Sequence, residues 1–373
     1  MVAAVIALLT TIVIFQVFAA FEGKKRTTTS GAEATENGLV ALLAIERDAR
    51  HAGYGMVGFG RGADRRIVCH QITTYAPTAG MVTSTVMPIQ ITDGGTGSDS
   101  ITISYSTSPF GATPARLASD VSTSDASTDL IVTNSANGAM FAPGDYVLVS
   151  EPSTPTKPCA RLRVTGTSSD LTGIRIHHLA GATAPADPAN PPGATNIFPV
   201  APTVGYVTTP ASPALVINMG AFTRSRYDVA NRNLRWTDMN AGTSDELADN
   251  VVMIQAQYGI SADAQSQDIV AWVNATGLWG VPDASDVARI KAVRVAVVSR
   301  STQPEREDVT AAACQTVGGT VNRGPCAWRD DSVTSPAPAI NLDQLGADWR
   351  RYRYRTYETV IPLRNIIWGD VNA

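Results

Sequence analysis

The four cysteines are the residues of this chain whose chemistry is easiest to interpret. Their number is even, and four cysteines allow three disulfide connectivities from sequence alone. Cys314 and Cys326 bracket the glycine-rich stretch GGTVNRGP, which favours a local disulfide. Cys69 and Cys159 would then pair over a long loop. Because disulfides persist in oxidising compartments, the cysteines favour a protein that works outside the cytoplasm.

Metal binding has weaker support in the sequence. A zinc site could be assembled from Cys69, His70, His177 and His178, but no CxxC or HxxxH spacing accompanies them. His177 and His178 are neighbours in an expected strand, so their side chains would point to opposite faces and could not act on one ligand together. We therefore expect no metal site.

Two acidic pairs are further candidates. Asp93 and Asp99 lie in DGGTGSDS, which loosely resembles a calcium loop but lacks the D-x-D-x-D-G order and the closing glutamate. We expect a solvated turn there, and simple surface charge at Asp330 and Asp331. The motifs G-x-S-x-G and H-E-x-x-H do not occur in the sequence. The chain is therefore predicted not to be an enzyme and to need no cofactor.

The C-terminal segment RRYRYRTY interleaves arginine with tyrosine. In a strand, Arg351, Arg353 and Arg355 would share one face, and Tyr352 and Tyr354 the other. Arginine with interleaved aromatic residues can bind single-stranded nucleic acid. The simpler interpretation is one solvated basic face and one tyrosine-packed face, and a net charge of −4 gives no field that attracts nucleic acid. No nucleic acid partner is expected.

The element that dominates the sequence is its apolar opening run, MVAAVIALLTTIVIFQVFAAF, which carries no charge. About 20 helical residues reach about 30 Å, the thickness of a bilayer's hydrocarbon core. A cleaved signal peptide fits poorly, because nothing basic precedes the run and the run is too long. A single-pass anchor and a fibre-forming stalk remain open. Lys24, Lys25 and Arg26 would place the following domain in the cytoplasm by the positive-inside rule, which conflicts with the cysteines.

We expect the helix to continue to about residue 52. Leu39, Leu42 and Leu43 recur at spacings of three and four, and this face would dock the helix onto the rest of the protein. Glu46 and Arg50 stand four residues apart and can form an ion pair on the helix surface. Glycines within this stretch each cost about 1 kcal/mol relative to alanine, so the helix could bend there.

The remainder of the chain is strand-rich. The predicted fold class is α+β, with a long N-terminal α-helix over residues 1–54 and a large antiparallel β-rich head over 55–373. Long irregular insertions are expected at about 180–213 and 301–343, as functional or variable surface. Runs rich in β-branched residues predict strands at 101–105, 129–133, 145–150, 160–164, 173–179, 214–219, 293–299 and 352–363, and a hairpin at 222–236.

Three parts of the sequence, in matching order, resemble the PilW-like minor pilins of bacterial type IV pili. The segment Glu36–Gly55 is similar to the end of that family's stalk. The segment Leu247–Ile260 is similar to its L-V-E-G-V-x-x-x-Q-x-x-Y-G-V motif. The segment Ile290–Ser301, together with the ending Arg351–Ile366, is similar to the family's late strand and terminal T-V-x-x-L-R-N. Together these parts cover about a quarter of the chain.

The resemblance implies a non-enzymatic minor pilin that primes type IV pilus assembly or belongs to a tip complex. It implies a single-pass location in the inner membrane with a periplasmic head, and a surface location in the pilus after assembly. Other minor pilins and the major pilin would be its partners, with a tip adhesin as a further candidate. A type II secretion pseudopilin, and a membrane-anchored periplasmic enzyme or binding protein, are the alternatives.

One feature departs from the family pattern. Pilins of this type begin with a short basic leader that ends in glycine, followed by an apolar run with an acidic residue near its start. This chain opens inside the apolar run. Our hypothesis is that Met1 is an internal methionine and that the natural product starts upstream.

Overall fold

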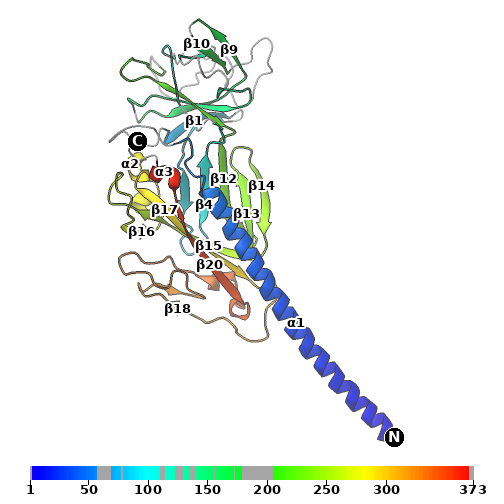
Figure 1. Ribbon diagram of the computed structural model, residues 1–373. Helices are drawn as coiled ribbons and strands as arrows, with labels where there is room; N and C mark the ends of the chain where they lie inside the picture. The colour runs from blue at the N-terminus through cyan, green and yellow to red at the C-terminus, as the bar shows by residue number, and fades with distance from the viewer. Residues whose placement is uncertain are drawn as a thin grey trace.

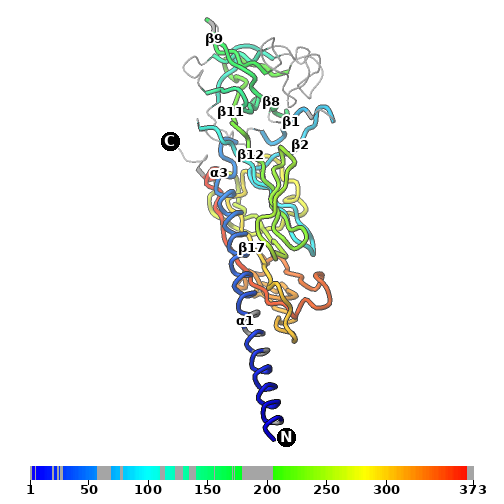
Figure 2. The backbone as a smooth tube through the Cα atoms, turned by 90° about the vertical axis from the view of Figure 1, so that its right-hand side faces the viewer, coloured from blue at the N-terminus to red at the C-terminus, as the bar shows by residue number. Residues whose placement is uncertain are grey.

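The protein consists of a long helix that leads into a β-rich head, as its computed structural model shows (Figure 1). Helix α1 (Val2–Ala49) projects from the head in its first part and runs along it in its later part (Figures 1 and 2). Within the described residues, no helix has both the length and the hydropathy to cross a membrane. The described residues are 2–56, 69–76, 79–109, 114–121, 129–133, 140–154, 156–171, 173–178 and 205–368.

Two antiparallel sheets form the half of the head beside α1, which we call the inner body. One has the order β14-β13-β12-β4-β3 and the other β16-β15-β17-β20. The strands are β3 (Ile89–Thr92), β4 (Ser100–Tyr105), β12 (Thr223–Ala230), β13 (Asn233–Asp238), β14 (Thr243–Ala248), β15 (Val251–Ile260), β16 (Ala271–Val273), β17 (Ile290–Arg300) and β20 (Tyr354–Pro362). Short helical pieces are η3 (Gly277–Trp279), α2 (Ala284–Val287), η4 (Leu342–Leu345), η5 (Trp349–Arg351) and α3 (Arg364–Trp368).

Two further sheets form the outer body, at the end of the head away from the N-terminus (Figure 1). They have the orders β2-β1-β8-β7-β11-β5 and β6-β10-β9, and all their pairings are antiparallel except β1 with β8. The strands are β1 (Gln71–Ala76), β2 (Gly80–Thr85), β5 (Ala115–Arg116), β6 (Leu130–Val132), β7 (Tyr146–Ser150), β8 (Cys159–Arg163), β9 (Gly166–Asp170), β10 (Gly173–His177) and β11 (Leu215–Gly220).

Most of the outer body lies between two strands that are neighbours in the inner body. Tyr105 at the end of β4 pairs with Thr223 at the start of β12. Strands β5 to β11 are therefore an insertion into this antiparallel pair. A disulfide between Cys69 and Cys159 joins the chain before β1 to β8, with Cα atoms 5.5 Å apart. Of the predicted insertion at about 180–213, residues 180–204 lie outside the described residues.

The centre of the inner body is β17, which is buried along its whole length. It lies between β15 and β20, and most of its residues are apolar, as expected for a strand with both faces covered. One face packs under α1 through Val293, Val295 and Val297. The other face is covered by the segment 301–343, through residues that include Ala327, Ile340 and Leu342.

The expectation for 301–343 was functional or variable surface, and this second covering shows that part of the segment belongs to the core. The segment carries β18 (Cys314–Gln315) and β19 (Val321–Asn322), and a disulfide joins Cys314 to Cys326. The guanidinium of Arg294 lies 4.7 Å from the ring centre of Trp328, which ties the segment to β17. Apolar side chains at irregular spacing form this core, and no strand or helix period could indicate it.

One aspartate of each acidic pair also differs from expectation, whereas Asp330 is exposed as expected. Asp331 is buried, and its carboxylate accepts hydrogen bonds from the backbone N–H groups of Gly318 and Ala337 and from Thr316. Burial alone would raise its pKa, but these hydrogen bonds outweigh it and lower the pKa. Asp99 is buried as well, so neither it nor Asp331 is a solvated surface charge. Each carboxylate holds a loop by accepting backbone hydrogen bonds.

Most of the expected strands occur with small shifts at their ends. The hairpin expected at 222–236 is β12 with β13, and Ala230 pairs with Asn233 across its turn. The last strand begins at Tyr354 rather than at 352, because residues 349–351 form the turn of η5. Arg351 therefore lies outside the strand, and the alternating pattern predicted for RRYRYRTY applies only to its later residues.

Candidate functional site

The first part of α1, Val2–Phe21, carries almost nothing but apolar surface; we call it the projecting part. Its two threonines turn their hydroxyls inward, since Thr10 donates to the carbonyl of Ile6 at 3.0 Å and Thr11 to that of Ala7 at 2.8 Å. The large apolar side chains that lie exposed on it are Val2, Ile6, Leu8, Leu9, Ile12, Val13, Ile14, Phe15, Val17, Phe18 and Phe21.

The later part, Ser30–Ala49, lies against the inner body; we call it the docked part. Its buried apolar side chains are Ala34, Ala41, Leu42, Ile45 and Ala49. These positions share one helix face because successive residues turn by about 100°. Small residues on this face allow the helix to approach the sheet closely.

The expected docking face is wrong at two of its three leucines. Leu42 is buried, but Leu39 is 43% exposed and Leu43 is 60% exposed. The spacing of three and four was correct, but the buried stripe lies about one residue to the side, and alanines make up most of it. Glu46 and Arg50 form the expected ion pair, with 2.5 Å between Oε1 and Nη2, on the same outer side as Leu43.

The closest approach of helix and head is at Gly38. A Cβ atom there would overlap the ring of Tyr357 on β20 and would lie 2.8 Å from the hydroxyl of Ser299 on β17. That hydroxyl donates a hydrogen bond of 2.6 Å to the carbonyl of Ala34. The absence of a side chain at position 38 therefore lets the helix backbone touch both strands.

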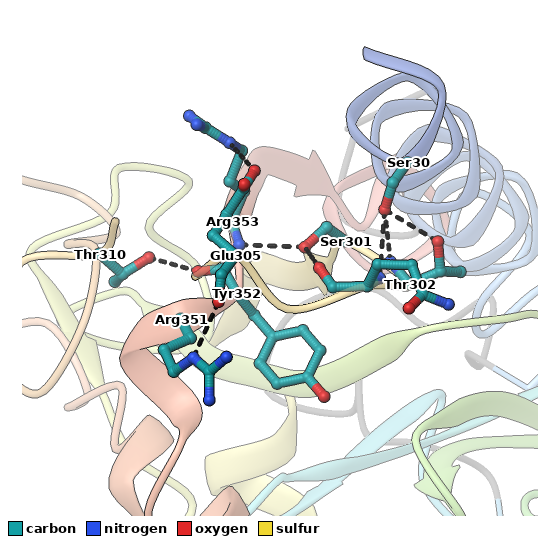
Figure 3. A network of polar contacts seen from close by, with 9 residues as sticks. Ser30, Ser301, Thr302, Glu305, Thr310, Arg351, Tyr352 and Arg353 are labelled. Atoms are coloured by element: carbon teal, nitrogen blue, oxygen red, sulfur yellow. Dashed lines mark hydrogen bonds and ion pairs between the residues drawn. The ribbon is translucent and has the colours of Figure 1, made fainter. Parts of the chain in front are cut away.

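A polar network holds the start of the docked part (Figure 3). Ser30 is buried, and its hydroxyl accepts hydrogen bonds from the backbone N–H groups of Thr302 at 2.8 Å and of Gln303 at 3.3 Å. The Thr302 hydroxyl lies 2.8 Å from that of Ser30 and donates to Glu33 at 3.0 Å. The chain that leaves β17 is therefore fixed directly onto α1.

The same network continues into the arginine- and tyrosine-rich segment (Figure 3). Ser301 accepts a hydrogen bond from the backbone N–H of Arg353 at 3.1 Å. The side chain of Arg353 donates to the Glu305 carboxylate at 3.0 Å, and that of Arg351 donates to the Glu305 carbonyl at 2.8 Å. These arginines therefore hold the start of segment 301–343 in place.

The C-terminal end of α1 is held by a buried carboxylate. Asp48 accepts a hydrogen bond of 2.6 Å from the Tyr227 hydroxyl, and the Tyr105 hydroxyl lies 3.5 Å away. Burial and the nearby Asp48 both raise the pKa of Tyr227, so the phenol stays a donor. Just beyond the helix, Asn365 donates to the carbonyls of His51 and Ala52, at 3.2 and 3.1 Å.

The residues that fix α1 include several that the sequence did not single out. Ser30, Asp48, Ser299 and Tyr227 carry no motif, and their partners come from far along the chain. Gly38 gave the clearest available signal, because a glycine inside a helix needs a reason. On sequence alone, this glycine indicates only a point where the helix could bend.

The predicted cysteine and histidine candidates lie apart from α1. His177 contacts Asp129 at 2.8 Å, whereas His178 is buried, so the two adjacent rings do not act together. Cys69 is disulfide-bonded to Cys159, away from this histidine pair. Among the residues that the structure describes, no three histidine, cysteine or acidic side chains are grouped as a metal site.

Among known proteins, no curated protein matches the sequence. A type IV-like pilin from Thermus thermophilus is similar in structure at 12% sequence identity and a TM-score of 0.24, over 39% of this chain and 66% of that one, just under two thirds of its length. Residues 208–365, less than half of the chain, match the family of the type IV pilus-assembly protein W, or PilW. The resemblance to the PilW family is therefore confirmed, and it lies in the part of the chain that runs from β11 to the end of β20 and into α3.

Proposed function

We propose that this chain is a non-enzymatic minor pilin that takes part in priming type IV pilus assembly or in the tip complex. The match to the PilW family supports a role in pilus assembly. The observation that carries the finer proposal is the division of α1 into a docked part and a projecting part. A helix fixed to its own head at one end and apolar at the other is suited to packing against other helices.

The projecting part supplies the driving force for assembly. Monomeric soluble proteins rarely expose an apolar surface of this extent, and such surfaces mark sites of protein or membrane contact. Fully burying one large apolar side chain is worth about 1.5–3 kcal/mol. Phe15 and Phe18, at 68% and 65% exposure, have most of that burial still to gain. We propose that they gain it in the inner membrane before assembly and against the helices of other pilins afterwards.

The docked part fixes where the head stands relative to that assembly. Contacts at Ser30, Gly38 and Asp48 lie along the whole docked part, so the head cannot swing freely about the helix. The outer body then lies at the end of the molecule away from the projecting part (Figure 1). We propose other minor pilins and the major pilin as partners, and a tip adhesin as a candidate for contact with the outer body.

The test is to delete the gene and count surface pili by electron microscopy. We expect few or no pili, restored by the unaltered gene. A gene carrying Phe15→Arg should fail to restore them, because the charge opposes burial of the projecting part. The matched control is Leu171→Arg, which changes a fully exposed apolar side chain of the outer body in the same way. Normal piliation in the deletion strain, or full rescue by Phe15→Arg, would contradict the proposal.

A further inference from the structure

Two arginines lie beside the same turn where the outer body meets the inner body. Arg161 lies on β8 of the outer body and Arg224 on β12 of the inner body. Arg161 donates from Nη1 to the Asn240 side-chain oxygen at 2.9 Å. Met239, the residue before Asn240, donates its backbone N–H to the carbonyl of Arg224 at 2.9 Å. One turn, which follows β13, therefore contacts the side chain of Arg161 and the backbone of Arg224.

Neither arginine has an acidic partner. Within the described part of the chain, no carboxylate forms an ion pair with Arg161 or Arg224. The contrast on the same sheet is clear, because Arg226 and Arg235 both lie within ion-pair distance of Asp228. The Nε atom of Arg224 is buried and has no hydrogen-bond partner. The Nε atoms of Arg226 and Arg300 share this state, but Arg226 is paired with Asp228 through its Nη2 atom. A buried donor without an acceptor is costly, and an anion at Arg224 would supply the missing acceptor.

The electrostatics agree with this geometry. Burial lowers the pKa of Arg161 and of Arg224, and the neighbouring charge of Arg161 lowers that of Arg224 further. Two like charges that are partly removed from water repel each other, and an anion between them would relieve both costs. The Tyr146 ring lies 4.8 Å from the Arg161 guanidinium and 5.7 Å from that of Arg163. Stacking on this ring holds the Arg161 guanidinium in place.

We propose that the junction of the two bodies binds a small oxyanion, phosphate or sulfate, between the guanidinium groups of Arg161 and Arg224. The planar donor fork of arginine matches the geometry of such oxyanions and can bind them with two hydrogen bonds. Both side chains are only half-buried, so an ion can enter from solvent. Because one arginine comes from each body, the bound ion joins them electrostatically.

The site predicts stabilisation by specific anions. Purified full-length chain is heated in sodium sulfate, in sodium phosphate and in sodium chloride at equal ionic strength. Sulfate and phosphate stabilise proteins in general, so the reference is the double variant Arg161→Gln, Arg224→Gln, measured in the same salts. The midpoint of unfolding of the unaltered chain should rise by roughly 3 °C more than that of the double variant. The matched control, Arg355→Gln, changes an exposed arginine on β20 and should respond like the unaltered chain.

Calorimetric titration with inorganic phosphate gives the second readout. We expect one ion per chain, lost in the double variant and kept in Arg355→Gln. If the double variant does not fold, Arg224→Lys replaces it; this substitution keeps the charge but loses the donor fork, and should weaken binding about tenfold. Equal salt responses in the unaltered chain and in a folded variant of either arginine, or no phosphate binding at all, would overturn the proposal.

Discussion

The two parts of helix α1 use opposite kinds of surface for the same purpose of packing. The docked part buries small side chains, such as Ala34 and Ala41, and adds hydrogen bonds at Ser30 and Asp48. The projecting part exposes large apolar side chains and makes no hydrogen bonds outside the helix among its described residues. Small residues and directional bonds specify one geometry, whereas large apolar side chains can pack against many neighbours. The difference indicates that the docked part determines position and the projecting part determines association.

The sharpest way to break the docked part is to fill the space at Gly38. The change Gly38→Leu places a side chain against the Tyr357 ring and the Ser299 hydroxyl, which are held by their own strands. We expect the free energy of unfolding to fall by about 3–5 kcal/mol. Urea unfolding of the purified chain, followed by tryptophan fluorescence, measures the loss.

The control for this change is on the same helix. A Cβ atom at Gly31 would have nothing within 4 Å, so Gly31→Leu meets open space. Its better helix propensity should leave stability unchanged or raise it by about 0.5–1 kcal/mol. Similar losses for both variants would mean that the helix tolerates no leucine in this stretch, and that close docking at Gly38 is not the cause.

Gly38 shows which features of the fold the sequence predicts and which it does not. Periodicity and β-branched runs predicted α1, β17 and the hairpin of β12 and β13, because these elements carry their own pattern. The docking face was misplaced because leucine is a stronger apolar signal than alanine, yet alanine permits the closest contact. A contact such as that of Gly38 with Tyr357 joins residues far apart in sequence, and no local pattern specifies it.

The same limit applies to the buried acidic groups. Asp99 and Asp331 lie in loops rich in glycine, serine or threonine, a composition typical of solvated turns. Each carboxylate is instead enclosed, because backbone N–H groups outside its own turn donate to it, that of Ala256 to Asp99 and that of Gly318 to Asp331. Which loop closes over which strand depends on the path of the whole chain. For the disulfides, the sequence allows three connectivities and favours Cys314 with Cys326 and Cys69 with Cys159, which are the two pairs in the structure.

A change of pH tests the buried carboxylate of Asp99 in the inner body, against which the docked part lies. Asp99 accepts hydrogen bonds of 2.8 Å from the N–H groups of Gly94 and Ala256, the latter on β15. Burial raises its pKa from 3.8 to about 7. In that range the folded chain holds a proton that the unfolded chain has released, so stability falls as pH rises from about 4 to about 7 and then levels off. The loss from this group is on the order of 3 kcal/mol.

The measurement is urea unfolding between pH 4.5 and pH 8. The variant Asp99→Asn cannot ionise, so it should lose the part of the pH dependence that Asp99 causes. The control is Asp93→Asn in the same loop, whose side chain is only half-buried. The charge of Asp93 is the last of the causes that raise the pKa of Asp99, so this variant should keep most of the pH dependence of the unaltered chain. Parallel curves for the unaltered chain and Asp99→Asn would show that Asp99 titrates near its ordinary pKa.

Two acidic residues of α1 allow the comparison to be made within one helix turn. Asp48 faces the head and accepts a hydrogen bond from Tyr227, whereas Glu46 pairs with Arg50 on the outer side. We expect Asp48→Ala to cost about 2–3 kcal/mol, because it leaves a buried tyrosine hydroxyl without its acceptor. The matched change Glu46→Ala should cost only about 0.3 kcal/mol. Equal effects in urea unfolding would mean that Asp48 does not fix the helix end.

The smallest expected effect concerns the first contact of the docked part. The change Ser30→Ala removes the acceptor for the N–H groups of Thr302 and Gln303, but alanine is also the better helix former. The two effects oppose each other and leave a net loss of about 1 kcal/mol. The matched change Thr35→Ala removes a hydroxyl that bonds only to its own helix at Gly31, and should not destabilise the protein.

Hydrogen exchange localises the result: Ser30→Ala should speed exchange at the start of the docked part and leave the projecting part unchanged. Faster exchange along the whole helix would mean that the two parts are not independent, and that the head stabilises the projecting part as well.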